Sequence, residues 1–107
     1  MELALLNTSI ITSDEGTYHI RPISTSEARS LVQTKKTISA IGHQATADVM
    51  TTLLGKRIPV NRIKFAQQPG QVALVFKLQD RIPEGKILII EEIDQIGYRF
   101  LLLTRTA

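Results

Sequence analysis

The sequence predicts a single α/β domain with a mixed β-sheet flanked by helices, and three observations lead to this prediction. Short apolar runs that suit strands alternate with segments that have the apolar spacing of amphipathic helices. Turn residues separate these segments, without a linker or an internal repeat. The chain has 107 residues, which suits one hydrophobic core, so we expect one domain over residues 1–107.

The first part of the chain predicts two strands and a helix. Residues 2–6 form an apolar run that ends at a polar turn, and residues 17–23 alternate well enough for a second strand. Ser24 and Glu27 have the spacing of a capping box, so a helix should follow to about Gln33. Its apolar residues lie three and four positions apart and would face the core.

A strand that passes through a glycine into a second helix is predicted around Gly42. The apolar run at 38–41 suits a buried central strand, and Gly42 permits a sharp turn and close approach of a ligand to the backbone. The helix should run from about 44 to 54 and end at Gly55. His43 lies at the helix start, where unpaired N–H groups and the helix dipole favour an anion.

The second half of the chain predicts a hairpin, a short helix and a last strand. Residues 62–65 and 72–78 alternate in hydropathy on either side of a type II turn signature at Gln68–Gly70. We therefore expect these two strands to pair with each other. A short helix over 91–96 and a strand over 98–104 complete the expected order.

Composition and charge favour a small anionic ligand. The formal net charge is only +3, and there are few aromatic residues, so neither long nucleic acid nor a base-stacking platform is expected as the basis of binding. No apolar run is long enough to span a membrane, and the N-terminal segment does not have the basic region of a signal peptide. With no cysteine present, a cytoplasmic location is expected.

No metal and no cofactor are expected. The two histidines, His19 and His43, lie in dissimilar contexts and do not have the spacing of a zinc site. The acidic residues Glu91, Glu92 and Asp94 are explained by the first turn of a short helix, where the dipole favours them.

Separate segments carry side chains that suit a phosphodiester ligand. Each has an ordinary structural explanation as a cap, a solvated side chain or a surface ion pair, and only the combination indicates a site. The candidates are Asn7, Thr8 and Ser9 after the first strand, Gly42 and His43 at the helix start, Arg62, and Arg81 with Glu84.

In their order and spacing, these blocks resemble a family of type III anti-CRISPR ring nucleases, long described as a domain of unknown function in archaeal viruses and bacteriophages. The resemblance covers nearly the whole chain. The matching blocks are Leu6-Asn7, Ala40-Ile41-Gly42-His43 with Thr46, Leu54-Gly55, Asn61-Arg62 and Arg81-Ile82-Pro83-Glu84-Gly85.

The resemblance implies a homodimer that cleaves cyclic tetra-adenylate, the second messenger of type III CRISPR defence, to linear di-adenylates without a metal. It implies that His43 is the general acid and that Arg81 and Glu84 are also active-site residues. Viral members carry Asn-Ala-Phe-Ser-x-Asn after the first strand, whereas this chain has Asn-Thr-Ser-Ile-Ile-Thr at 7–12. Ile10 therefore falls where the serine is expected, and Ser9 or Thr8 would have to replace it.

The expected mechanism uses the 2′-hydroxyl of the RNA as nucleophile. Helix N–H groups, Asn7 and Ser9 would align it, Arg81 would stabilise the transition state, and His43 would protonate the leaving 5′-oxygen. Glu84 would orient His43, favour its protonated form or position Arg81. Alternatives are a metal-independent ribonuclease acting on linear RNA, a nucleic-acid-binding regulatory protein, and a sponge that binds the ring without cutting it. Both a viral inhibitor and a host regulator fit these residues.

Overall fold

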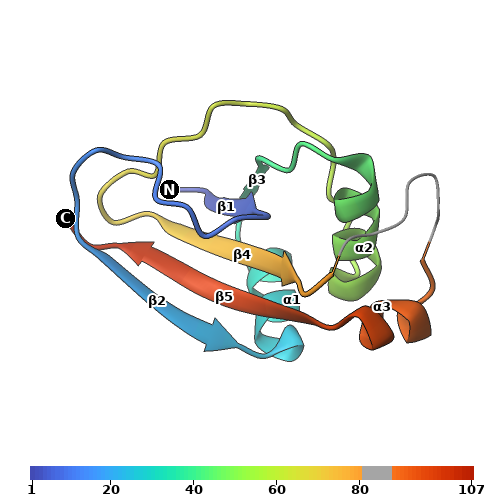
Figure 1. Cartoon of the computed structure of the whole chain (residues 1–107). Coiled ribbons are helices and arrows are strands. Elements are labelled where there is room, and N and C mark those ends of the chain that lie inside the picture. Colours follow the sequence, from blue (N-terminus) through green and yellow to red (C-terminus); the bar gives the residue numbers. More distant parts are fainter. Residues whose placement is uncertain (81–87) are drawn as a thin grey trace.

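The sheet is built around β1 (Leu3–Leu6), a strand of four consecutive apolar residues that are all buried. A computed structural model describes residues 1–80 and 88–107 of the chain. In it, β1 pairs in parallel with β3 (Thr37–Ser39) on one side and with β4 (Val72–Leu78) on the other (Figure 1). A strand enclosed in this way favours a continuous apolar run, because neither of its faces meets water.

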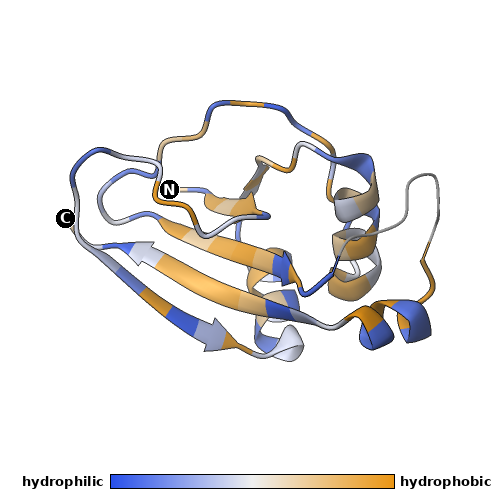
Figure 2. Ribbon diagram, in the orientation of Figure 1, coloured by the Kyte–Doolittle hydropathy of each residue, from blue (hydrophilic) through white to orange (hydrophobic). Residues whose placement is uncertain are grey.

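Antiparallel strands extend the sheet beyond β4. β4 pairs with β5 (Tyr98–Arg105), and β5 pairs with β2 (Tyr18–Ile23), so the strand order within the described residues is β2-β5-β4-β1-β3. Figure 2 shows the apolar residues concentrated in the middle of β4 and β5. Phe76 and Phe100 lie opposite each other there, with ring centroids 5.2 Å apart. The predicted mixed α/β sheet is confirmed.

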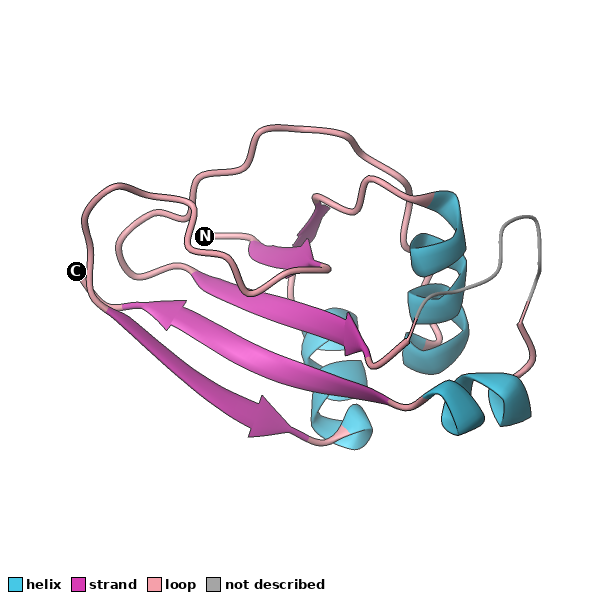
Figure 3. Ribbon diagram, in the orientation of Figure 1, coloured by secondary structure: helices cyan, strands magenta, loops and turns pink. Residues whose placement is uncertain are grey.

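The helices α1 (Thr25–Thr34), α2 (Gln44–Leu54) and α3 (Ile90–Ile96) pack their apolar residues on one face of the sheet (Figures 1 and 3). The predicted caps are present at two helices. Ser24 Oγ accepts a hydrogen bond from the Glu27 N–H at 3.0 Å at the start of α1. Gly55 ends α2 in the left-handed conformation, with φ 68°.

Two basic side chains connect the two longer helices by hydrogen bonds. Arg29 in α1 donates to the carbonyl oxygen of Leu53, in the last turn of α2, at 2.8 Å. Lys56, just beyond α2, donates to the carbonyl oxygen of Val32 in α1 at 3.0 Å. The charge of Lys56 therefore complements the carboxyl end of the neighbouring helix α1.

The other face of the sheet carries a smaller apolar cluster and is covered by connections without regular structure. Phe65, in the connection 56–71, packs against this cluster. Gln67 anchors the same connection: its buried amide donates to the carbonyl oxygens of Gln71 at 2.7 Å and Leu103 at 2.8 Å. The cluster itself consists of Ala4, Leu6, Ala73, Val75 and Leu103.

The predicted hairpin between residues 62–65 and β4 is wrong. Residues 62–65 form no strand, and the connection from α2 to β4 is irregular throughout (Figure 3). Both hydrogen-bonding edges of β4 are already occupied, by β1 and by β5. The predicted turn at its start is nevertheless present, because Gln71 N donates to Gln68 O at 2.9 Å and Gly70 has φ 83°.

The strand before Gly42 was also misplaced. β3 is the edge strand of the sheet rather than a central one, and it ends at Ser39. Ser39 Oγ donates to the carbonyl oxygen of Pro59 at 2.6 Å and accepts from the Ile41 N–H at 3.3 Å. At this point the chain leaves the sheet and is hydrogen-bonded to the connection that follows α2.

None of the helices in the described ranges has the length and apolar character that crossing a membrane requires.

We predict that Gln67→Met destabilises the fold by about 2 kcal/mol, because it removes a buried amide that donates to the carbonyl oxygens of Gln71 and Leu103. Urea unfolding followed by circular dichroism measures the loss. The matched control is Gln68→Met, since Gln68 is exposed and bonds through its main chain. Equal stabilities for the two variants would show that Gln67 does not anchor the connection.

Candidate functional site

The candidate site lies where the parallel strands end, at the edge of the sheet formed by their carboxyl ends. β1, β3 and β4 run in the same direction, with Leu5 opposite Ser39 and Leu6 opposite Val75. Their carboxyl ends therefore meet at one edge, which is where open α/β sheets place their ligands. Asn7–Ser9 follow β1 at this edge, and Gly42–His43 follow β3. The predicted Arg81 and Glu84 lie outside the described residues.

The junction between β3 and α2 is held by the segment that carries Arg62. Asn61 donates from its side-chain amide to the carbonyl oxygen of Ser39 at 2.8 Å, and from its main chain to Ile41 at 2.8 Å. Arg62 Nε donates to the carbonyl oxygen of Gly42 at 2.9 Å. The structure thus brings Arg62 to Gly42, although they are far apart in sequence. Arg62 positions the junction through one nitrogen, and its guanidinium has further N–H donors to offer a ligand.

His43 is the N-cap residue of α2, but its ring does not act as the cap. Its backbone is extended, with φ −124° and ψ 129°, and its carbonyl oxygen accepts from the Ala47 N–H at 3.1 Å. The side chain is exposed and makes no capping hydrogen bond. The ring is therefore available to a ligand, and α2 begins without a side-chain acceptor for its first N–H groups.

The charge around this helix start also favours an anion. The first turn of α2 contains no acidic residue that would repel one. The nearest carboxylate along the helix, Asp48, accepts a hydrogen bond from the Gln44 side chain at 2.8 Å. An uncapped N-terminus of an 11-residue helix, with Arg62 bound to the preceding carbonyl, has the N–H donors and the partial positive charge to hold a phosphate.

Gly42 is not required by the shape of the chain. It does not have a positive φ, unlike Gly55 and Gly70. A Cβ added at Gly42 would lie 3.7 Å from Arg62 Cγ, which is ordinary van der Waals contact. The sharp turn that the sequence predicted at Gly42 therefore does not need a glycine, and the missing side chain only leaves space beside Arg62.

The loop after β1 uses its two hydroxyl groups differently. Thr8 Oγ1 accepts a hydrogen bond from the Ile10 N–H at 3.2 Å, within the loop itself. Ser9 Oγ accepts from Lys77 Nζ, at the end of β4, at 3.4 Å. Asn7 is half-buried at the strand end. Lys77 was missed by the sequence analysis, where it counted only as a polar position of an alternating strand.

The candidate residues thus fall into two groups along one edge. Gly42, His43 and Arg62 lie around the start of α2, while Ser9 and Lys77 lie at the end of β4. β1 separates the two groups, because it lies between β3 and β4 in the sheet. No hydrogen bond joins the groups within the described part of the chain.

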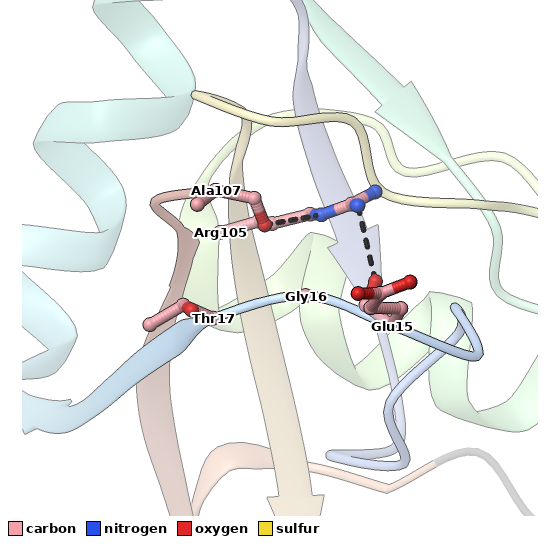
Figure 4. Close-up of a pocket in the computed structure, with 5 residues that line it drawn as sticks. All are labelled: Glu15, Gly16, Thr17, Arg105 and Ala107. Atoms are coloured by element: carbon pink, nitrogen blue, oxygen red, sulfur yellow. Dashed lines mark hydrogen bonds between the residues drawn. The ribbon is translucent and has the colours of Figure 1, made fainter.

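A hollow of about 460 Å³ lies at the opposite end of the sheet (Figure 4). It is lined by Glu15, Gly16, Thr17, Arg105 and Ala107. Arg105 donates to the main-chain oxygens of Glu15 at 3.1 Å, Ala107 at 3.1 Å and Gln67 at 2.6 Å. This arginine ties three segments together with its donors, so the hollow is a structural feature rather than a candidate site.

The described residues contain no group of three His, Asp or Glu side chains arranged to hold a metal ion. Glu92, from the acidic cluster near the start of α3, accepts a hydrogen bond from the Ile89 N–H at 3.3 Å. Glu91 and Glu92 lie in the first turn of α3, as predicted, whereas Asp94 lies beyond that turn.

The protein is an α/β domain, and its candidate residues lie at the carboxyl ends of the parallel strands, where a ligand would bind. The chain belongs to the STIV B116-like family, whose model matches residues 3–100. The solved structure of B116 of Sulfolobus turreted icosahedral virus has the same fold, with a TM-score of 0.87 over 97% of this chain and 99% of that one, at 24% identity.

Viral and bacterial relatives resemble almost the whole chain. Protein 26 of a Sulfolobus islandicus filamentous virus is 35% identical over 94% of this chain and 88% of its own length. Protein ORF117 of Acidianus two-tailed virus is 32% identical over 96% and 92%. Protein YddF of Bacillus subtilis is 36% identical over 98% of both chains. The family is therefore present in viruses and in a bacterium.

We predict that Gly42→Ala leaves the free energy of unfolding unchanged or raises it by up to about 1 kcal/mol, because alanine fits this backbone and restricts the unfolded chain. Gly55→Ala is the matched comparison and should cost about 1–2 kcal/mol, because Gly55 is left-handed with φ 68°. Thermal and urea unfolding measure both. If Gly42→Ala lost as much as Gly55→Ala, the junction would need its glycine for folding.

Proposed function

We propose that this protein is a metal-independent ring nuclease that cleaves cyclic tetra-adenylate to linear di-adenylates and so switches off type III CRISPR signalling. The observation that carries the proposal is the start of α2. There, an exposed histidine stands at an uncapped helix N-terminus, and Arg62 is bound to the carbonyl of the preceding residue. The resemblance of the Ile-Gly-His, Asn-Arg and Arg-x-x-Glu-Gly blocks to ring nucleases supports the same reading.

In the proposed reaction the protein aligns the reacting atoms, stabilises the transition state and protonates the leaving group. N–H groups in the first turn of α2 hold a non-bridging phosphate oxygen, so that the 2′-oxygen lines up with the phosphorus and the departing 5′-oxygen. The 2′-hydroxyl gives up its proton to solvent water as its oxygen bonds to phosphorus, and the bond from phosphorus to the 5′-oxygen breaks. His43 gives its proton to that 5′-oxygen, and the product ends in a 2′,3′-cyclic phosphate.

Arg81 and Glu84 complete this proposal through the resemblance alone. Arg81 would stabilise the charge that develops on the phosphate, since its planar guanidinium matches two oxygens. Glu84 would orient His43, favour its protonated form or position Arg81. Both residues follow β4 in the sequence, and β4 ends at the edge where α2 begins.

A sponge that binds the ring without cutting it is the second candidate, because Ile10 stands where the family carries a serine. The two readings differ in one observable, the appearance of linear products. Either role is suited to the cytoplasm, where the second messenger would be encountered. The viral and bacterial relatives fit both an inhibitor carried by a virus and a regulator used by a host.

We predict that His43→Ala slows cleavage of cyclic tetra-adenylate by about 10²–10⁴-fold and keeps most of the binding affinity, because general acid catalysis contributes about that much. Single-turnover digestion in EDTA, with products resolved by chromatography, measures the rate. His19→Ala is the matched control, since His19 is an exposed histidine on β2. Wild-type cleavage should be complete in EDTA, since the proposed mechanism uses no metal.

Four results of this assay would contradict the proposal. Cleavage by His43→Ala at the wild-type rate would remove the general acid. Loss of activity in EDTA with rescue by a divalent ion would replace the mechanism with a metal-dependent one. Equal cleavage of linear oligoadenylate would favour a general ribonuclease, and tight binding without any product would favour the sponge.

The protein should also be a homodimer, because a ring of four identical nucleotides can lie on the two-fold axis of a symmetric pair. Ile20 supports this expectation: it lies on the face of β2 opposite the helices and is 48% exposed, and Ile10 is 73% exposed in the loop after β1. A second copy would cover such residues. Sedimentation velocity should show a dimer at micromolar concentration, and a monomer that still binds the ring would contradict the prediction.

A further inference from the structure

Two basic side chains lie directly opposite each other on the face of the sheet away from the helices. Lys77 of β4 is the register partner of Arg99 of β5. Strand alternation places them on the same face as Val75 and Leu103, in the smaller apolar cluster. Like charges directly opposite each other in an antiparallel pair are destabilising. Folding alone does not explain this pair.

No ion pair between described residues joins a carboxylate to Lys77 or Arg99. The ion pair found in the described ranges joins Arg21 and Glu27, with 3.8 Å between their charged groups, and involves neither residue. Lys77 is half-buried, and its ammonium group donates to Ser9 Oγ at 3.4 Å. A lysine has three N–H donors, so this contact leaves donors for an anion. A bound anion would neutralise the charges of Lys77 and Arg99 and so stabilise their arrangement.

Ser9, rather than Thr8, is the loop hydroxyl that contacts Lys77. The Ser9 oxygen accepts from Lys77, which leaves its own O–H proton free to be donated. The Thr8 oxygen instead accepts from the Ile10 N–H inside the loop. Of the two hydroxyl groups in this loop, only that of Ser9 contacts a basic side chain among the described residues.

The position of this cluster relative to α2 indicates the kind of ligand. Lys77 is near the carboxyl end of β4, on the edge where α2 begins, and β1 lies between β4 and β3. β4 and β3 are separated by two strand spacings, which is roughly 10 Å between the two strands. A ligand with several phosphates held in a fixed arrangement can place one phosphate at Lys77 and another at the start of α2.

We infer that Lys77 and Arg99, with the Ser9 hydroxyl, form a second phosphate subsite that holds a phosphate of the ring other than the one being cleaved. This inference rests on the proposed function and extends it to Lys77 and Arg99, which the family resemblance did not supply. The subsite positions the ring across the sheet edge, and the scissile phosphate remains at the start of α2. It also identifies Ser9 as the loop hydroxyl that meets the ligand.

The test measures the affinity for cyclic tetra-adenylate by calorimetry, in a His43→Ala background that prevents cleavage. Lys77→Gln and Arg99→Gln should each weaken binding by about 10-fold or more, since a hydrogen bond to a charged group contributes about that much. Lys77→Arg should restore most of the loss. Ser9→Ala should weaken binding more than Thr8→Ala does. Lys36→Gln is the matched control, because Lys36 is an exposed cation just before β3, at the other end of the strand.

Thermal unfolding of the free protein separates binding from structure. Lys77→Gln should melt at the wild-type temperature or above it, because it removes a like-charge pair. A lower melting temperature together with weaker binding would show that Lys77 is only structural, and would overturn the subsite. Unchanged affinity in Lys77→Gln and Arg99→Gln would overturn the subsite and leave the proposed function in place. Failure of the parent variant to bind the ring would overturn both.

Discussion

The parallel pairing of β1 with two neighbours is the constraint on which the rest of the structure depends. Every residue of β1 is buried, and its two faces contribute to different apolar clusters. A shift of register by one residue would exchange those faces, so the pairing is strongly specified. Because β3 and β4 run parallel to β1, the loop after β1, the start of α2 and the end of β4 meet at one edge. The candidate site is a consequence of strand direction.

The sequence was sufficient to predict most elements and their caps, because those signals are local. The spacing of Ser24 and Glu27 located the start of α1, and Gly55 located the end of α2. Partner choice is not local. The alternation at 62–65 suggested a strand, but β1 and β5 already occupy both edges of β4, and Phe65 packs against the smaller apolar cluster instead. The unbroken apolar run of β1 was the available indication of the central strand.

The candidate site could be predicted only in part, for the same reason. The convergence of Arg62 on Gly42 was expected from the combination of blocks, and a hydrogen bond of 2.9 Å now gives it a physical basis. Lys77 could not be found by spacing, because a single lysine near a strand end looks like an ordinary surface residue. The proposed role of Lys77 in binding depends on two tertiary features: the strand register places Arg99 opposite it, and the loop after β1 brings Ser9 to its ammonium group. The roles of Arg81 and Glu84 stay predictions.

The most direct test of the central claim is to map where the ring binds. Amide chemical shifts of the His43→Ala variant, recorded by NMR during titration with cyclic tetra-adenylate, report on each backbone position. The account predicts the largest changes at Asn7–Ser9, Gly42 and the first turn of α2, with little change at Glu15–Thr17 and Arg105. Changes concentrated around Arg105, with the edge unaffected, would contradict the claim that the carboxyl ends of the parallel strands form the site.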